Sequence, residues 1–163
     1  MPKVYIGIGS NLGDRLDNIQ RALTAIDKII PLQQLSPVYE TEPKYVVDQP
    51  AFLNMAVAGD CEMKPKQLLA SLQKAEIEIG RVPSAKRYGP RAIDLDILFY
   101  GDQVISEPDL SVPHRLIAER RFVLRPLADI APQLRHPSSG LTIIEMLVAL
   151  ENVENQEVIS IDV

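Results

Sequence analysis

Two stretches of the chain carry apolar residues at the three- and four-residue spacing of an amphipathic helix. They are Asp14–Ile30, which is followed by Pro31, and Lys66–Ile79, which is followed by Gly80. This spacing places the apolar side chains along one face of an α-helix. Proline cannot continue a helix, and glycine is common just past a helix C-terminus, so both stretches also end in a stop signal. The sequence therefore predicts two helices, each of which packs one face on a sheet.

Shorter stretches alternate between apolar and other residues, which predicts β-strands. They are Val4–Ile8, Gln33–Thr41, Phe52–Ala58 and Ile93–Tyr100. We expect a turn from Gly7 to Asn11 that lets a second backbone or a ligand come close, and Pro37 predicts an edge or a bulge in the second strand. The order β-α-β-β-α-β is typical of an α+β, ferredoxin-like fold with an antiparallel sheet. Both helices then cover one sheet face, so we expect the functional site on the other face.

The pattern is looser after Gly101-Asp102. We expect a loop or short strand at Leu110–Arg115, a short helix at Leu116–Ala128, a helix from Thr142 to about Leu150 and an edge strand within Glu157–Val163. The third of these begins with a capping-box pattern, Thr-x-x-Glu. We expect this part to cover the open sheet face and to form one wall of a cleft. The chain of 163 residues is thus interpreted as a single domain with a core at 1–100 and a C-terminal extension at 101–163.

Composition narrows the function classes. The net charge of −5 argues against a general nucleic-acid binder. No apolar run approaches the length of a membrane helix, and the N-terminus reads as a strand without the apolar region of a signal peptide. The single Cys61 cannot form an internal disulfide. We therefore expect a cytoplasmic protein with no membrane or nucleic-acid partner, and no obligate protein partner is evident.

The segment from Arg81 to Tyr100 combines two kinds of charge. Its first half, up to Arg91, contains basic residues, prolines and a glycine but no acidic residue, which predicts a cationic loop. In the strand that follows, Ile93, Leu95, Ile97 and Phe99 are expected on one face, and Asp94, Asp96, Leu98 and Tyr100 on the other. Two carboxylates so placed have Cα atoms about 6.5–7 Å apart and suit Mg²⁺. The alternative is a solvated strand face beside a charged surface loop.

Several motifs in this order resemble the 6-hydroxymethyl-7,8-dihydropterin pyrophosphokinase family of folate biosynthesis. The resemblance runs along essentially the whole chain, from Gly9-Ser10-Asn11-Leu12-Gly13-Asp14 to Ile130-Ala131-Pro132. Its most specific part is Arg87-Tyr88-Gly89-Pro90-Arg91-Ala92-Ile93-Asp94-Leu95-Asp96-Ile97, with further support from Asp48-Gln49-Pro50, Phe52-Leu53-Asn54 and Val112-Pro113-His114.

This resemblance implies transfer of pyrophosphate from ATP, as co-substrate, to the hydroxymethyl oxygen of the pterin, with release of AMP and with two Mg²⁺ ions bound by Asp94 and Asp96. The catalytic residues it implies are Arg81, Arg91, Asp94 and Asp96. Those implied for ATP are Gln73, Glu76, Arg81, Arg91, Ser111, His114 and Arg120. Those implied for the pterin are Thr41, Pro43, Phe52, Asn54, Tyr88 and Phe122. The loops Glu42–Gln49 and Arg81–Arg91 are expected to close over the substrates.

Some positions differ from the family pattern. They are Pro83, Asp109 and Arg115, and they bear on the outer nucleotide contacts more than on the metal site.

Two other functions remain open for this order of elements. An RNA-recognition domain predicts surface aromatics on a basic sheet face, where this chain has two aspartates. A regulatory module that only binds a small molecule requires neither the carboxylate pair nor the cationic loop.

Overall fold

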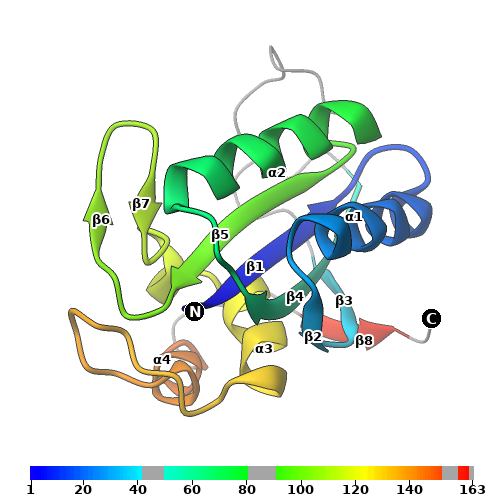
Figure 1. Cartoon of the computed structure of the whole chain (residues 1–163). Coiled ribbons are helices and arrows are strands. Elements are labelled where there is room, and N and C mark those ends of the chain that lie inside the picture. The colour runs from blue at the N-terminus through cyan, green and yellow to red at the C-terminus, as the bar shows by residue number, and fades with distance from the viewer. Residues whose placement is uncertain (42–49, 81–90, 152–157, 162–163) are drawn as a thin grey trace.

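A computed structural model describes residues 1–41, 50–80, 91–151 and 158–161. This part of the chain is a mixed α+β structure built on one antiparallel sheet (Figure 1). Its strands are β1 (Lys3–Ser10), β2 (Leu32–Leu35), β3 (Val38–Thr41), β4 (Phe52–Asp60), β5 (Asp94–Tyr100) and β8 (Val158–Ile161). The order across the sheet is β5-β1-β4-β3-β8, and β2 also pairs with β4. A separate hairpin consists of β6 (Ile105–Ser106) and β7 (Ser111–Val112).

Helices α1 (Arg15–Ile29) and α2 (Pro65–Ile79) pack on the first face of this sheet (Figure 1). The side chain of Asp14 caps α1 by accepting a hydrogen bond from the Asp17 N–H at 3.1 Å, and Gly80 ends α2 with a φ of 128°. A first hydrophobic core lies between helices and sheet, and it includes Ile6, Ile8, Ile19, Ile26, Met55, Val57, Leu68 and Leu72. Both helices predicted from apolar spacing are confirmed to within a residue or two of their bounds.

Helices α3 (Arg121–Ile130) and α4 (Ile143–Ala149) pack on the second face, and a short 3-10 turn, η1 (Ile117–Glu119), precedes α3. Their core is formed by Tyr5, Ala56, Ala58, Leu98, Phe99, Leu124, Leu127, Ile143, Met146 and others. The predicted capping box is confirmed, since Thr142 Oγ1 accepts from the Glu145 N–H and Glu145 Oε1 accepts from the Thr142 N–H. The sheet is therefore covered by helices on both faces. Within the described ranges no helix has both the length and the apolar character needed to cross a bilayer.

Strand β5 contains an irregularity that the alternation of residues does not reveal. Ile97 pairs with Ile6, but Phe99 pairs with Tyr5, so Leu98 is an extra residue in the ladder. This bulge reverses the alternation. Phe99 joins the second core together with Leu98, and Tyr100 joins the first core. The prediction that Phe99 shares a face with Ile97, and that Tyr100 lies opposite, is therefore wrong.

The stretch predicted as a single strand at residues 33–41 forms two, β2 and β3, separated at Ser36-Pro37. Ser36 donates its N–H to the Ala56 carbonyl at 2.9 Å and accepts the Ala56 N–H on its hydroxyl at 2.9 Å. Pro37 was expected to mark an edge or a bulge, and it lies instead in the break between two strands. Strand β3 is not at an edge, because it pairs with β4 and β8. Strand β1 continues to Ser10, so most of the predicted Gly7–Asn11 turn is strand.

Candidate active site

A pocket of about 450 Å³ opens on the second face of the sheet, next to the part covered by α3 and α4. Its walls come from strands β1, β3, β4 and β5 and from the segment that runs from the β6–β7 hairpin to the start of α3. Of the predicted site residues, the pocket is lined by Thr41, Phe52, Asn54, Arg91, Asp94, Asp96, Ser111, His114, Arg120 and Phe122. Residues expected to bind metal, nucleotide and pterin thus share one cavity.

Asp94 and Asp96 lie on β5 opposite two glycines of β1. In the antiparallel register Gly9 faces Asp94 and Gly7 faces Asp96, so a G-x-G sequence is paired with a D-x-D sequence. Both glycines line the pocket, and a Cβ at Gly7 would lie 3.3 Å from Leu98 Cδ2. Arg91 Nη1 is 3.8 Å from Asp94 Oδ1 and is the more buried of the two side chains, at 12% exposure against 31%.

The donor set fits magnesium. Within residues 1–41, 50–80, 91–151 and 158–161 there is no group of three or more histidine, cysteine, aspartate or glutamate side chains that could hold a metal ion. Asp94 and Asp96 therefore provide a pair of carboxylates and no closed protein cage. Mg²⁺ is commonly held by one or two carboxylates and takes its other ligands from water and substrate phosphates.

His114 lines the pocket beside β5, where its backbone N–H donates to the Leu98 carbonyl at 3.0 Å, and burial together with the nearby Arg120 and Arg115 lowers its pKa to about 4. The imidazole is therefore neutral at pH 7. Its Nδ1 accepts a hydrogen bond from the Leu116 N–H at 3.3 Å, so the proton of the neutral ring is on Nε2. His114 thus offers one N–H donor, and positive charge beside it comes from the arginines.

Aromatic and amide side chains also line the pocket. Asn54 is 7% exposed and donates from Nδ2 to the hydroxyl of Thr41, which is 2% exposed, at 2.8 Å. Phe52 lies two residues before Asn54 on β4, and Phe122 lies across the pocket with the Arg120 guanidinium carbon 5.6 Å from its ring centre. A flat heterocycle with an amide edge matches two aromatic rings and a buried amide.

Gly9 is required by this arrangement. A Cβ at Gly9 would lie 3.0 Å from Asn54 Oδ1 and 3.7 Å from Phe52 Cδ1. The expected turn is absent here, because Gly9 lies in β1, and the group close to it is the Asn54 side chain.

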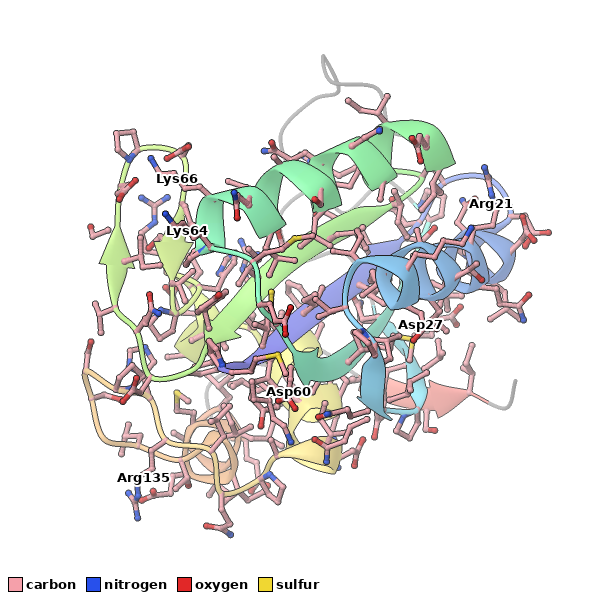
Figure 2. The ribbon with its side chains drawn as sticks, in the orientation of Figure 1. Arg21, Asp27, Asp60, Lys64, Lys66 and Arg135 are labelled. Carbon is pink, nitrogen blue, oxygen red and sulfur yellow. The ribbon has the colours of Figure 1, made fainter. Side chains whose placement is uncertain are left out.

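The β6–β7 hairpin forms the outer wall, where Glu107 and Asp109 line the pocket. It is attached to the start of α2 by Lys66, which pairs with Glu107 and lies 3.5 Å from Asp109 (Figure 2). Asp109 is a departure from the family pattern, and here its charge is balanced by a lysine from another element.

Two predicted nucleotide residues do not line the pocket. Gln73 is exposed on α2, and Glu76 is buried beneath β5 with its carboxylate bonded to the Leu95 N–H. The predicted contacts of Arg81, Pro43 and Tyr88, and the two expected closing loops apart from Arg91, lie outside the described residues.

Asn11 was missed by sequence reasoning. It is 1% exposed, and its side chain accepts from the Arg91 N–H at 2.7 Å and donates to the Pro50 carbonyl at 3.1 Å. The signals in the sequence were a polar residue directly after a buried strand and its place in the Gly9–Asp14 motif.

Comparison with known proteins agrees with this geometry. Residues 5–132 match the family model of 7,8-dihydro-6-hydroxymethylpterin-pyrophosphokinase. A 2-amino-4-hydroxy-6-hydroxymethyldihydropteridine pyrophosphokinase of Pseudomonas aeruginosa is 44% identical over 149 residues, which cover 90% of this chain and 91% of the relative. The folate synthesis bifunctional protein of Arabidopsis thaliana is 49% identical over 129 residues, which are 78% of this chain but 27% of that protein.

The chain spans between 19% and 27% of the length of the plant, fungal and slime-mould folate synthesis proteins that it matches. In fold, it is similar to the crystal structure of Plasmodium falciparum HPPK-DHPS, with a TM-score of 0.74 at 17% identity over 91% of this chain and 43% of that one. The family match covers well over half of the sequence and includes the D-x-D strand, the pocket glycines and His114. The chain therefore belongs to the 7,8-dihydro-6-hydroxymethylpterin-pyrophosphokinase family.

Proposed function

We propose that the protein transfers pyrophosphate from ATP to the hydroxymethyl group of 6-hydroxymethyl-7,8-dihydropterin in a magnesium-dependent reaction that yields the pterin diphosphate and AMP. The observation that carries this proposal is the shared pocket. Asp94, Asp96, Asn54 and Phe52 all line it, and Gly9 of β1 pairs with Asp94 on one side and with Asn54 on the other. A phosphoryl-transfer enzyme needs a charged end for the nucleotide and a complementary end for the acceptor, within reach of each other.

At the charged end, Asp94 and Asp96 would hold the metal ions, for which the resemblance implies two. Bound Mg²⁺ would neutralise charge on the phosphate oxygens. Arg91 and Arg120 would bind the same phosphates, since planar guanidinium groups match phosphate oxygens in pairs of hydrogen bonds. His114 would add a neutral N–H donor, and Ser111 a hydroxyl on the nucleotide side.

At the neutral end, the rings of Phe52 and Phe122 would hold the pterin between them. Asn54 would read its amide edge, with its own orientation fixed by the bond to Thr41. The hydroxymethyl group would then point toward Asp94 and Asp96. Excluding water from such a pocket strengthens the polar contacts within it.

In the reaction, the hydroxymethyl oxygen attacks the β-phosphorus of ATP in line with the bond to the oxygen that bridges to the α-phosphorus. A new oxygen–phosphorus bond forms, the bridging bond breaks, and AMP leaves with that oxygen. The proton of the hydroxymethyl group is released to solvent, and no side chain is assigned as a base. Catalysis rests on positioning and on stabilising charge at the transferred group.

The architecture suits this reaction. We propose that residues 1–100 form a ferredoxin-like core that carries the metal and pterin residues, and that residues 101–163 belong to the same domain and form the facing wall. The support is that Ser111, His114, Arg120 and Phe122 all line the pocket from beyond residue 100.

A nucleotide product assay tests the proposal. The protein is incubated with ATP, Mg²⁺ and the pterin, and AMP is separated from ADP. We expect AMP only when both pterin and metal are present. Formation of ADP would indicate an ordinary kinase, and a folded protein with no turnover would indicate a module that only binds its ligands.

A further inference from the structure

Glu76 holds the strand that carries the two pocket aspartates. It lies on α2, is 4% exposed, and its Oε2 accepts a hydrogen bond from the Leu95 N–H at 2.8 Å. Leu95 is the residue between Asp94 and Asp96. A hydrogen bond to an ionised carboxylate is shorter and stronger than one between neutral groups.

The position of β5 in the sheet explains why this bond matters. In the described sheet β5 is the end strand and pairs with β1 on one side. The N–H groups on its other side therefore need acceptors from outside the sheet. Leu95 is 4% exposed, so water is a poor substitute. Leaving a buried N–H without an acceptor costs more free energy than a formed hydrogen bond contributes. The Glu76 carboxylate therefore stabilises this strand by accepting the Leu95 N–H.

Glu76 also lies on the far side of the strand from the substrates. It is not among the residues that line the pocket, whereas Asp94 and Asp96 are. The Leu95 side chain belongs to the first core, and Leu95 lines the pocket together with its neighbours Asp94 and Asp96. A bond to the backbone at Leu95 therefore fixes the direction of both carboxylates without contact between Glu76 and the ligands.

We propose that Glu76 is a positioning residue for the metal site: its carboxylate fixes the backbone at Leu95 so that Asp94 and Asp96 project together into the pocket. The inference rests on the proposed function for the identity of the ligand, and it replaces a direct nucleotide contact as the role of Glu76. Groups that orient metal ligands from behind typically change metal affinity by about 10- to 100-fold when they are removed.

Two variants separate the hydrogen bond from the charge. Glu76→Gln keeps an oxygen that can accept the Leu95 N–H, and Glu76→Leu removes the acceptor at similar volume. Glu78→Gln and Glu78→Leu are matched controls, because Glu78 is exposed on the same helix. Amide hydrogen exchange at Leu95, followed by NMR, reports the bond itself. Binding of Mn²⁺ in the presence of ATP, followed by electron paramagnetic resonance, reports the consequence for the metal.

We expect slow exchange at Leu95 in the unaltered protein, in Glu76→Gln and in both controls, and fast exchange in Glu76→Leu. Mn²⁺ binding should weaken by about 10- to 100-fold in Glu76→Leu and stay within a few-fold of the unaltered protein in the others. Slow exchange in folded Glu76→Leu, or unchanged Mn²⁺ binding despite fast exchange, would overturn the inference.

Two further outcomes are distinguishable. If Glu76→Leu does not fold, the Glu76→Gln variant still tests the inference. Loss of Mn²⁺ binding in Glu76→Gln, with slow exchange at Leu95, would show that the charge of Glu76 acts on the ligands directly. That result would overturn a positioning role. If the unaltered protein binds no Mn²⁺ with ATP, the proposed function itself fails, and the metal part of this inference fails with it, whatever the exchange at Leu95.

Discussion

Asn11 and Arg91 are bonded to each other twice, although 80 residues separate them. The Asn11 N–H donates to the Arg91 carbonyl at 3.0 Å, and the Arg91 N–H donates to Asn11 Oδ1 at 2.7 Å. The same side chain donates to the Pro50 carbonyl. The end of β1 is thus attached to the residues that lead into β5 and β4, the strands that carry the aspartates and Asn54.

Replacing Asn11 with alanine should destabilise the fold and impair the site together. It leaves the Arg91 N–H and the Pro50 carbonyl without this partner, so we expect a loss of about 1–3 kcal/mol in the free energy of unfolding. Urea denaturation measures the loss. Asn11→Asp keeps the acceptor for Arg91 but removes the donor to Pro50. Its free energy of unfolding should therefore lie between those of the unaltered protein and the alanine variant. An alanine variant as stable as the unaltered protein would contradict the assignment.

Asp96→Ala should abolish turnover while the protein stays folded. The side chain is half-buried and lines the pocket, so its removal costs little packing but takes away a proposed metal ligand. Since metal ions supply several kcal/mol of transition-state stabilisation, we expect kcat to fall by about 100-fold or more. Asp102→Ala, an exposed aspartate just beyond the same strand, is the control. Near-normal activity in Asp96→Ala would show that the metal assignment is wrong.

Gly9→Ala should act on the pterin and not on ATP. Its φ is not among the positive values found for other glycines, so alanine is tolerated by the backbone. The added Cβ would press on Asn54 Oδ1, 3.0 Å away, and overpacking of this kind costs about 1–3 kcal/mol. We expect a rise of about tenfold in the KM for the pterin, with a smaller change for ATP. Steady-state kinetics decide, and a larger change for ATP would contradict the placement of the pterin.

His114 should make the fold less stable in acid. Burial and neighbouring arginines lower its pKa from 6.5 to about 4, so the unfolded chain binds the proton more readily than the folded one. This contribution to stability is fully present above pH 6.5 and is lost as the pH falls toward 4.

His114→Gln, which does not titrate, should therefore show a flatter dependence of unfolding free energy on pH in that range. Some slope should remain, because burial also lowers the pKa of His136. Urea denaturation at several pH values measures both curves. Equal slopes for the two proteins would mean that His114 is not held in its neutral form.

The fold was largely predictable because each predicted element has a local cause. The helices follow from apolar spacing, and the faces of β4 follow from alternation, with Ala56 and Ala58 on one side and Met55 and Val57 on the other. The bulge at Leu98 was not predictable in this way. It depends on how β5 pairs with β1, and alternation along one strand carries no information about its partner.

The residues of the candidate site also fall into two groups, those that the sequence predicts and those that it does not. Asp94, Asp96, Phe52 and Asn54 belong to recognisable motifs, and they do line one pocket. Asn11 and Glu76 act through backbone groups of distant residues, 80 and 19 positions away. A buried polar residue is visible in a sequence, but its partner is not, because the fold decides which backbone group lies within reach.

The bulge in β5 also affects how this strand can change. Before Leu98 the strand presents aspartates to the pocket, and after it the same strand presents an aromatic ring to a hydrophobic core. Deleting Leu98 would remove the extra residue and restore strict alternation, with Phe99 still facing the second core and Tyr100 still facing the first. Insertions of two residues would also preserve sidedness. A homologue that aligns with a one-residue gap at Leu98 would therefore keep Phe99 and Tyr100 in their cores and lose only the Leu98 side chain from the second core.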